Sequence, residues 1–326
     1  MPLGELRSFD VETRTCHGGS RRNDAQREGL LNVEVSDVRR VGVVGAGLMG
    51  SGIAEICARA GRSVSVVEVD EPAAQRGRSR IEASLQRAVS AGKLTDDAST
   101  ETMGRIAVGT DMDALGDCDL VVEAVVEAEA EKVRVFEVLD KVVEAPSALL
   151  ASNTSSIPIM KLAMATDRPQ QVVGLHFFNP VPVLPLVEVV ASLLSAEATV
   201  DLAERFAVEA LGKCAIRAKD RAGFIVNALL VPYLLSAVRM MESGFATAED
   251  IDAGMVKGCA HPMGPLALCD LIGLDTTMAV ANSLYEEFKE PLYAPPPLLA
   301  RMVDAGLLGK KTGRGFYDYT AASRPH

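Results

Sequence analysis

The chain has 326 residues, of which 48% are hydrophobic, and it carries a formal net charge of -11. At about 150 residues per domain, this length corresponds to roughly two domains. The acidic balance argues against a nucleic-acid-binding protein, which would present a basic face, and no segment reaches the roughly 18 consecutive apolar residues that a membrane span needs.

The first 37 residues differ in composition from the rest of the chain. They mix arginines with acidic residues, contain Gly-Gly-Ser at positions 18–20, and show no sustained apolar period. This pattern predicts a disordered N-terminal arm over residues 1–37. A transit peptide would be poor in acids and a secretory signal would have an apolar core, so the arm fits neither, and we expect a cytoplasmic protein. Two interpretations of the arm stay open: it is a genuine segment of the protein, or it results from an assigned start codon upstream of the true one.

A glycine motif, GAGLMG, comprises Gly45, Ala46, Gly47, Leu48, Met49 and Gly50. It lies between an apolar run over residues 41–44, predicted to be a buried strand, and a predicted helix over residues 49–59. In such a motif Gly45 makes a tight turn, Gly47 lets the backbone approach a pyrophosphate, and Gly50 lets the helix pack closely on the strand. The free N–H groups of the helix N-terminus would face the phosphates.

The acidic residue after the second predicted strand selects between the two nicotinamide dinucleotides. This strand covers residues 63–67 and ends at Glu68. A carboxylate there would accept hydrogen bonds from the adenosine ribose hydroxyls and repel a 2'-phosphate. Val69 follows, where an NADP-binding protein would more often have a cation or a hydroxyl. The sequence therefore predicts NAD as the cofactor.

Three more apolar runs of strand length follow, over residues 120–126, 148–152 and 172–178, with helical patterns such as residues 130–143 between them. This alternation predicts an α/β fold with a doubly wound sheet, in which ligands bind at the carboxyl ends of the strands. Ser155 and His176 fall at or just past such ends, so we expect both to be functional.

The pattern becomes helical from Gly223 onward, and Thr247 with Asp250 predicts the capping box of a later helix. We therefore place a domain boundary near Arg221. The expected organisation is a nucleotide-binding domain over residues 38–221 followed by an all-α C-terminal domain over residues 222–326.

His176 is the candidate acid or base. Oxidation of a secondary alcohol needs a group that takes the hydroxyl proton while hydride leaves the same carbon, and imidazole titrates close enough to neutral pH to act in both directions. A core role beside two phenylalanines is the alternative. Glu188 lies among apolar residues of the run LVEVV, where an unpaired carboxylate would be costly. Its expected partner is the second nitrogen of His176, unless it is a solvent-facing residue of an edge strand.

Seven segments of the chain are motifs of one family: GAGLMGSGIA, DCDLVVEAVVE, ASNTSSIPI, GLHFFNPVPVLPLVEVV, GFIVNALLVPYL, GLDTT and GKKTGRGFYDY. Together they resemble the 3-hydroxyacyl-CoA dehydrogenase family, in particular its short, stand-alone 3-hydroxybutyryl-CoA dehydrogenases. The resemblance covers about residues 39–319. It implies a Rossmann-type domain, a helical C-terminal domain that forms a homodimer interface, and oxidation of (S)-3-hydroxyacyl-CoA by NAD.

The resemblance also implies roles for individual residues. Ser155 and Asn227 correspond to polar residues that hold the reacting oxygens of the substrate, although Asn227 could instead make a structural helix contact. The positions used around NAD and the reacting end of the substrate are Glu127, Lys132, Asn179 and Lys311. Ser84 falls on a position that contacts CoA, and Lys93 is the nearest lysine for the CoA phosphates, although a solvated helix-end lysine is the alternative.

The predicted function is NAD-dependent oxidation of (S)-3-hydroxyacyl-CoA, with 3-hydroxybutyryl-CoA and acetoacetyl-CoA as the expected pair. Fatty-acid oxidation and butanoate metabolism use the same chemistry, so the pathway stays open, as does the preferred acyl chain length. Two alternatives remain. One is a relative that acts on a free sugar acid such as gulonate, and the other is a structural, crystallin-like protein without turnover.

Neither cysteines nor histidines show the spacing of a metal site, so no metal is predicted. The six cysteines have no CxxC pair and mostly fall in apolar runs, which indicates reduced, buried thiols; they are Cys16, Cys57, Cys118, Cys214, Cys259 and Cys269.

Overall fold

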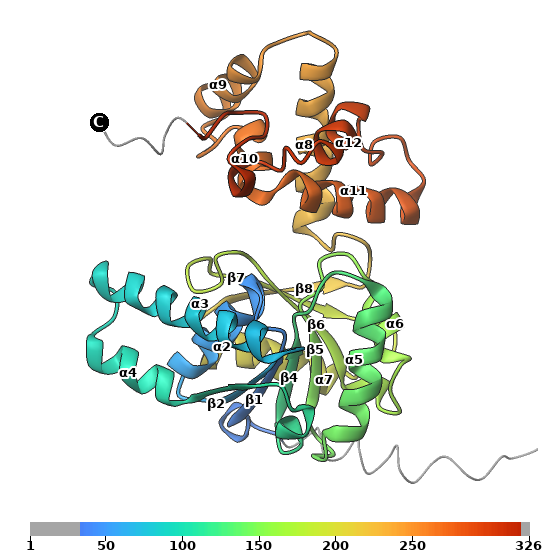
Figure 1. Ribbon diagram of the computed structural model, residues 1–326. Helices are drawn as coiled ribbons and strands as arrows, with labels where there is room; N and C mark the ends of the chain where they lie inside the picture. Colours follow the sequence, from blue (N-terminus) through green and yellow to red (C-terminus); the bar gives the residue numbers. More distant parts are fainter. Residues whose placement is uncertain (1–32, 321–326) are drawn as a thin grey trace, which may run out of the picture.

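The computed structural model describes residues 33–320. Figure 1 shows two parts, a sheet flanked by helices below and a purely helical part above it. The chain passes from one to the other after the last strand, β8, and enters the long helix α8. This order, a mixed α/β unit followed by helices, agrees with the sequence prediction. No helix within residues 33–320 is long and apolar enough to cross a membrane.

The sheet has eight strands in the order β3-β2-β1-β4-β5-β6-β7-β8. Strands β1 to β6 are parallel, whereas β7 runs antiparallel to β6 and pairs in parallel with β8. The chain order reverses beside β1, which is the crevice where ligands bind in doubly wound sheets. The strands are β1 Arg40–Val44, β2 Ser63–Val67, β3 Ile106–Gly109, β4 Leu120–Glu123, β5 Leu149–Ser152, β6 Val172–Phe177, β7 Leu186–Ala191 and β8 Cys214–Lys219.

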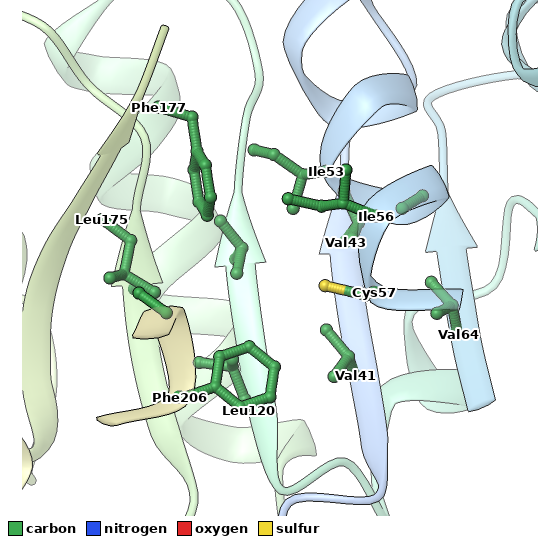
Figure 2. Packing of buried hydrophobic residues seen from close by; sticks show 14 of the residues in the cluster. Val41, Val43, Ile53, Ile56, Cys57, Val64, Leu120, Leu175, Phe177 and Phe206 are labelled. Atoms are coloured by element: carbon green, nitrogen blue, oxygen red, sulfur yellow. The ribbon is translucent and has the colours of Figure 1, made fainter. Parts of the chain in front are cut away.

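Helices cover both faces of this sheet, which explains why its central strands are almost continuously apolar. On one face, Ile53 and Cys57 of α2 belong to the same buried cluster as Val41 and Val43 of β1, together with Phe206 (Figure 2). On the other face α5 and α6 pack. The helices of the sheet part are α2 Leu48–Arg59, α3 Glu71–Ser90, α4 Asp96–Gly104, α5 Glu129–Val142, α6 Ile159–Ala163 and α7 Glu197–Arg205.

The helical part has its own apolar core, distinct from those of the sheet. Its helices are α8 Val226–Glu242, α9 Ala248–Cys259, α10 Pro265–Ile272, α11 Leu274–Phe288 and α12 Pro297–Asp304. Thr247 caps α9 by accepting a hydrogen bond from the Asp250 N–H. The C-terminal motif is held by the buried Asp270, whose carboxylate accepts hydrogen bonds from the N–H groups of Phe316 and Tyr317.

The end of the predicted arm and the end of one predicted strand differ from the structure. Residues 33–37, inside the predicted arm, include a short 3-10 helix, Val35–Asp37, and Val35 is buried in the sheet core; the rest of the predicted arm lies outside the described residues. The predicted strand over residues 120–126 was too long, because β4 ends at Glu123. Val126 extends the apolar run but does not belong to the strand. It is 69% exposed and lines a groove at the strand ends.

Candidate active site

The glycine turn has the geometry of a phosphate-binding loop. Gly45 adopts φ +95°, and a Cβ added there would lie 2.7 Å from the Ala124 carbonyl oxygen. A Cβ added to Gly50 would lie 1.8 Å from the Gly45 oxygen, so both positions exclude a side chain. At Gly47, in contrast, an added Cβ meets no atom within 4 Å. The backbone there is open to a ligand, which fits the pyrophosphate of NAD.

A groove of about 530 Å³ extends from this turn along the carboxyl ends of β1, β2 and β4. Gly47 and Glu68 lie on it, and its walls are mainly apolar, as an adenosine site requires. Glu68 Oε1 accepts a hydrogen bond from the Ala46 N–H at 2.6 Å and Oε2 one from the Val69 N–H at 3.0 Å. Because a carboxylate has about four acceptor positions, Glu68 retains acceptor capacity for ribose hydroxyls. The residues present therefore fit NAD.

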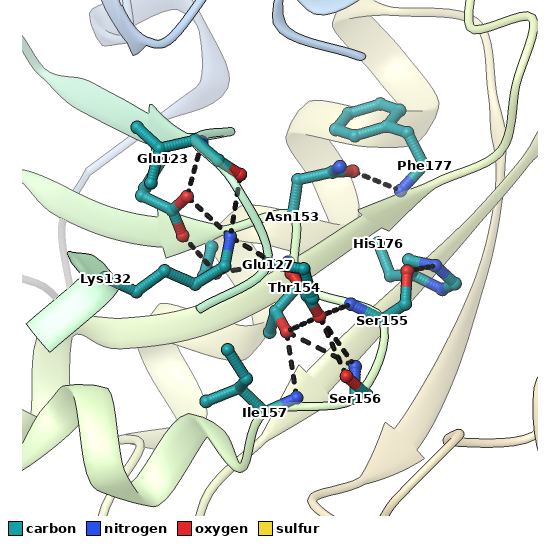
Figure 3. A network of polar contacts seen from close by, with 12 residues as sticks. Glu123, Glu127, Lys132, Asn153, Thr154, Ser155, Ser156, Ile157, His176 and Phe177 are labelled. Atoms are coloured by element: carbon teal, nitrogen blue, oxygen red, sulfur yellow. Dashed lines mark hydrogen bonds and ion pairs between the residues drawn. The ribbon is translucent and has the colours of Figure 1, made fainter. Parts of the chain in front are cut away.

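Lys132, which is buried, and Glu127, which is partly exposed, belong to a polar network beside this groove (Figure 3). The Lys132 ammonium lies 2.6 Å from Glu123 and 3.2 Å from Glu127. Although burial raises the pKa of Glu127, the adjacent Lys132 and hydrogen bonds from Thr154 and two following residues outweigh it, and the pKa lies below its ordinary value. Glu127 is therefore a carboxylate whose charge the surrounding donors stabilise.

The network fixes the loop that carries Ser155. Glu127 Oε1 accepts hydrogen bonds from the Thr154 hydroxyl at 2.5 Å, the Ser155 N–H at 2.9 Å and the Ser156 N–H at 3.1 Å. Asn153 is also held, since its side-chain oxygen accepts the Phe177 N–H of β6. As a result the Ser155 side chain points toward His176 (Figure 3), with Oγ 3.1 Å from Nε2.

His176 and Glu188 are directly opposite each other in the antiparallel β6–β7 pair. The Nδ1 atom of His176 lies 2.7 Å from Glu188 Oε2, and both residues are buried. Because a carboxylate only accepts, Nδ1 carries the proton and the Nε2 lone pair faces Ser155. The expected pairing is thus present, and the solvent-facing alternative for Glu188 is wrong, because β8 covers the outer side of β7 and Glu188 is 0% exposed.

Asn227 and Lys311 come from the helical part. Asn227 stands in the first turn of α8, next to the two residues whose N–H groups bind Glu188. Within residues 33–320 its amide has no hydrogen-bond partner, so it is available to a ligand. Lys311 is about half exposed and pairs with both oxygens of Asp275 at 2.6 Å. The structure does not place Lys311 among the residues that line the groove along β1, β2 and β4.

A smaller cavity of about 180 Å³ brings together Ser84 of α3, Leu48 of α2 and Asn179, which follows β6. Two cations line it as well, Arg80 and Arg87. Lys93, beyond the C-terminus of α3, is not among the residues that line it.

Three residues of the site were missed by the sequence analysis. Glu123 is 0% exposed and accepts hydrogen bonds from Lys132 and from the Ser152 hydroxyl; a glutamate inside the apolar run LVVEAVV was the available signal. Arg80 and Arg87 gave no signal beyond their spacing around Ser84 on one helix. Within the described part of the chain, no cluster of three or more His, Cys, Asp or Glu residues could hold a metal ion.

The sheet topology, the open glycine turn and the histidine with its carboxylate define a nicotinamide-dependent dehydrogenase. Comparison with known families gives the same class. Residues 40–221 match the NAD-binding domain of 3-hydroxyacyl-CoA dehydrogenase, and residues 223–319 match its C-terminal domain. The chain therefore belongs to the 3-hydroxyacyl-CoA dehydrogenase family and is an NAD-dependent enzyme.

Individual relatives agree with this assignment. A 3-hydroxybutyryl-CoA dehydrogenase of Mycobacterium tuberculosis is 61% identical over 282 residues, which cover 86% of this chain and 99% of the relative. The crystal structure of M. tuberculosis FadB2 superposes with a TM-score of 0.86 at 61% identity, covering 87% of this chain and 99% of the other. That of (S)-3-hydroxybutyryl-CoA dehydrogenase PaaH1 from Ralstonia eutropha gives 0.82 at 44% identity, with 87% and 99% covered.

Proposed function

We propose that the enzyme interconverts (S)-3-hydroxybutyryl-CoA and acetoacetyl-CoA with NAD. The observation that carries the proposal is the position of His176 between Ser155 and Glu188, at 3.1 and 2.7 Å. This geometry provides a base at the carboxyl end of β6, on the same edge of the sheet as the glycine turn that follows β1. The short acyl chain is supported by the names of the M. tuberculosis and R. eutropha relatives.

The proton steps follow from the hydrogen bonds of the histidine. The substrate hydroxyl binds between Ser155 Oγ and His176 Nε2, and Nε2 takes its proton as hydride leaves the same carbon. NAD, when bound, would supply the acceptor for that hydride. Glu188 stabilises the resulting imidazolium through Nδ1. In the reverse direction the imidazolium returns the proton to the carbonyl oxygen. Asn227 supplies an amide to the reacting end of the substrate.

The proposed cofactor contacts involve the glycine turn itself, Glu68 after β2 and the loop that carries Ser155. Gly47, with Leu48 and Met49 at the start of α2, would hold the pyrophosphate at the helix N-terminus, and Gly45 and Gly50 would shape the turn that allows it. Glu68 would bind the ribose hydroxyls and would disfavour NADP. Glu127 and Lys132 keep the Ser155 loop in place beside the nicotinamide end, a role that the hydrogen bonds of Glu127 to the loop and its ion pair with the buried Lys132 support. Asn179 and Lys311 are assigned to the same region by family position.

The cavity between α2 and α3 is the proposed binding place for the phosphates of CoA. Arg80 and Arg87 supply two cations around Ser84, and guanidinium groups bind phosphate oxygens in a fixed fork geometry. They take the role that the sequence gave to Lys93. These cations favour CoA over a free sugar acid, which has no phosphate for them to bind. The intact base argues against a non-catalytic, crystallin-like protein.

We further propose a homodimer that forms through the helical part. Several of its large apolar side chains are exposed, among them Leu229 at 74%, Phe245 at 80% and Leu271 at 50%, and exposed apolar surface is often covered by association. Light scattering after size exclusion tests it, since a monomer mass at working concentration would contradict the dimer. A cytoplasmic location is proposed from the free cysteines of residues 33–320.

The test of the function is NADH oxidation with acetoacetyl-CoA, beside free acetoacetate, for the wild type, His176→Ala and His261→Ala. His261 contacts Tyr233 in the helical part and serves as the matched histidine control. We expect turnover with the thioester only, its loss in His176→Ala, and wild-type activity in His261→Ala. Full activity in His176→Ala would show that the base is misassigned, and turnover of the free acid would contradict a CoA substrate.

A further inference from the structure

The two oxygens of Glu188 bind groups from different parts of the chain. Oε2 meets His176 at 2.7 Å, on the neighbouring strand. Oε1 accepts the N–H groups of Ile225 and Val226, at 3.0 and 2.9 Å, where α8 begins. Among the described residues, His176 is the one ionisable group in hydrogen-bond contact with Glu188. The carboxylate behind the base is therefore held by the first helix of the helical part.

The segment that presents these N–H groups has an unusual backbone. Phe224 adopts φ +48°, and Gly223 before it adopts φ +71°. Left-handed conformations are uncommon for residues with bulky side chains, and where they persist they often mark functional sites. The other left-handed non-glycine residues within residues 33–320, Ala260 and Lys289, each end a helix, where this conformation is common. Phe224 precedes a helix instead, so helix termination does not account for it.

The side chain of Phe224 also reaches the base. Its ring lies edge-on to the imidazole of His176, with the centroids 5.5 Å apart and the planes at 61°. Phe224 is only 8% exposed. One residue therefore contacts His176 through its ring and orients the next two N–H groups toward Glu188 through its backbone.

We propose that Phe224 is a positioning residue for the catalytic pair. When α8 is docked, the Phe224 turn holds the Glu188 carboxylate and the His176 imidazole in the orientation that forms their hydrogen bond. The inference rests on the proposed role of His176 as the base. It goes further in making the helical part a component of the catalytic pair, because Glu188 has both oxygens satisfied only when the Phe224 turn is in place.

The test compares Phe224→Gly, Phe224→Leu and Ala260→Gly. Phe224→Gly removes the ring and frees the backbone, Phe224→Leu keeps apolar bulk, and Ala260→Gly relaxes an equally left-handed residue remote from the site. We expect kcat to fall about tenfold or more in Phe224→Gly with KM values unchanged, because a misaligned base costs rate rather than binding. Phe224→Leu should lie between, and Ala260→Gly should match the wild type.

A second readout does not depend on turnover. In protein labelled with 15N-histidine, the His176 Nδ1 proton that is bonded to Glu188 should give a downfield resonance in the wild type, which broadens or moves upfield in Phe224→Gly. If the wild type has no activity with acetoacetyl-CoA but the resonance still changes in Phe224→Gly, the proposed function is contradicted and the positioning role is not. Wild-type kcat and an unchanged resonance in Phe224→Gly, or an equal loss of kcat in Ala260→Gly, would overturn the positioning role. If Phe224→Gly fails to fold, Phe224→Leu decides by the same two measurements.

Discussion

Lys132 Nζ lies 2.6 Å from Glu123 Oε1, and neither side chain is more than 1% exposed. Lys132 also lies 3.2 Å from Glu127, which accepts a hydrogen bond from the Ser155 N–H. Replacing Lys132 with Met would leave Glu123 as an uncompensated buried charge, so we expect the free energy of unfolding to fall by about 3–5 kcal/mol. Urea denaturation measures it. A loss below about 1 kcal/mol, the range of exposed pairs, would show that solvent reaches the pair.

Glu127 should make stability depend on pH in the acidic range. Its pKa is below the ordinary value in the folded state, despite burial, because of Lys132 and the hydroxyl and N–H donors of the loop. A lowered carboxyl pKa contributes stability above the unfolded pKa, and this is lost as pH falls through the folded value. The deficit of Glu127→Gln against the wild type should therefore be largest near neutral pH and shrink below about pH 4. A deficit that is constant with pH would contradict this electrostatic origin.

Removing the charge of Glu188 should act on the rate. Glu188→Gln retains the size of the side chain but offers an amide to two backbone N–H groups and to His176, so the imidazole loses its preferred tautomer. We expect kcat to fall at least about 100-fold, by analogy with other acid-oriented histidines. Steady-state kinetics in both directions measure it. Equal loss through KM alone would indicate a binding role instead.

Arg87 should bind the phosphates of the CoA substrate. Arg87→Ala is preferable to a change at Arg80, whose guanidinium also donates to the Ala46 carbonyl. We expect KM for acetoacetyl-CoA to rise about tenfold, the loss of one charge-assisted contact, while KM for NADH stays constant. Lys93→Ala is the control and should leave both constants unchanged. A larger rise of this KM in Lys93→Ala than in Arg87→Ala would indicate that the phosphates bind at the end of α3 instead.

The cysteines should divide into reactive and inert groups. Burial raises the pKa of Cys57, Cys118 and Cys269 to about 12 in each case, and a thiol is nucleophilic only as the thiolate. Cys214 and Cys259 are exposed. The sequence prediction of buried thiols is thus correct for three of these and wrong for two. In a Cys16→Ser background, Ellman's reagent should titrate two thiols in the native protein and five after unfolding.

Local features of the site were predictable because they depend on neighbouring residues. Gly45 and Gly50 fill positions where a Cβ would collide with backbone, so the motif itself carries the geometry of the turn. The approach of His176 and Glu188 was predictable from chemistry, since a carboxylate in an apolar strand requires a partner and few were available.

Features that depend on strand direction or on distant segments were not predictable. Nothing in LVEVV indicates that β7 runs antiparallel to β6. A strand that is buried on both faces is apolar throughout, so it lacks the alternation of apolar and polar residues that is typical of antiparallel strands. The partner of Glu123 is nine residues away across a loop, and the two N–H groups that hold Glu188 come from the helical part. Such contacts arise only when the chain is folded.

The antiparallel register of β6 and β7 limits how this enzyme can diverge. His176 pairs directly with Glu188, and Leu175 with Val189. A slip of one residue would turn every side chain of β7 to the opposite face and remove the carboxylate from the histidine. An insertion in the connection over residues 178–185 would therefore preserve the reaction centre only where the two strands keep this alignment.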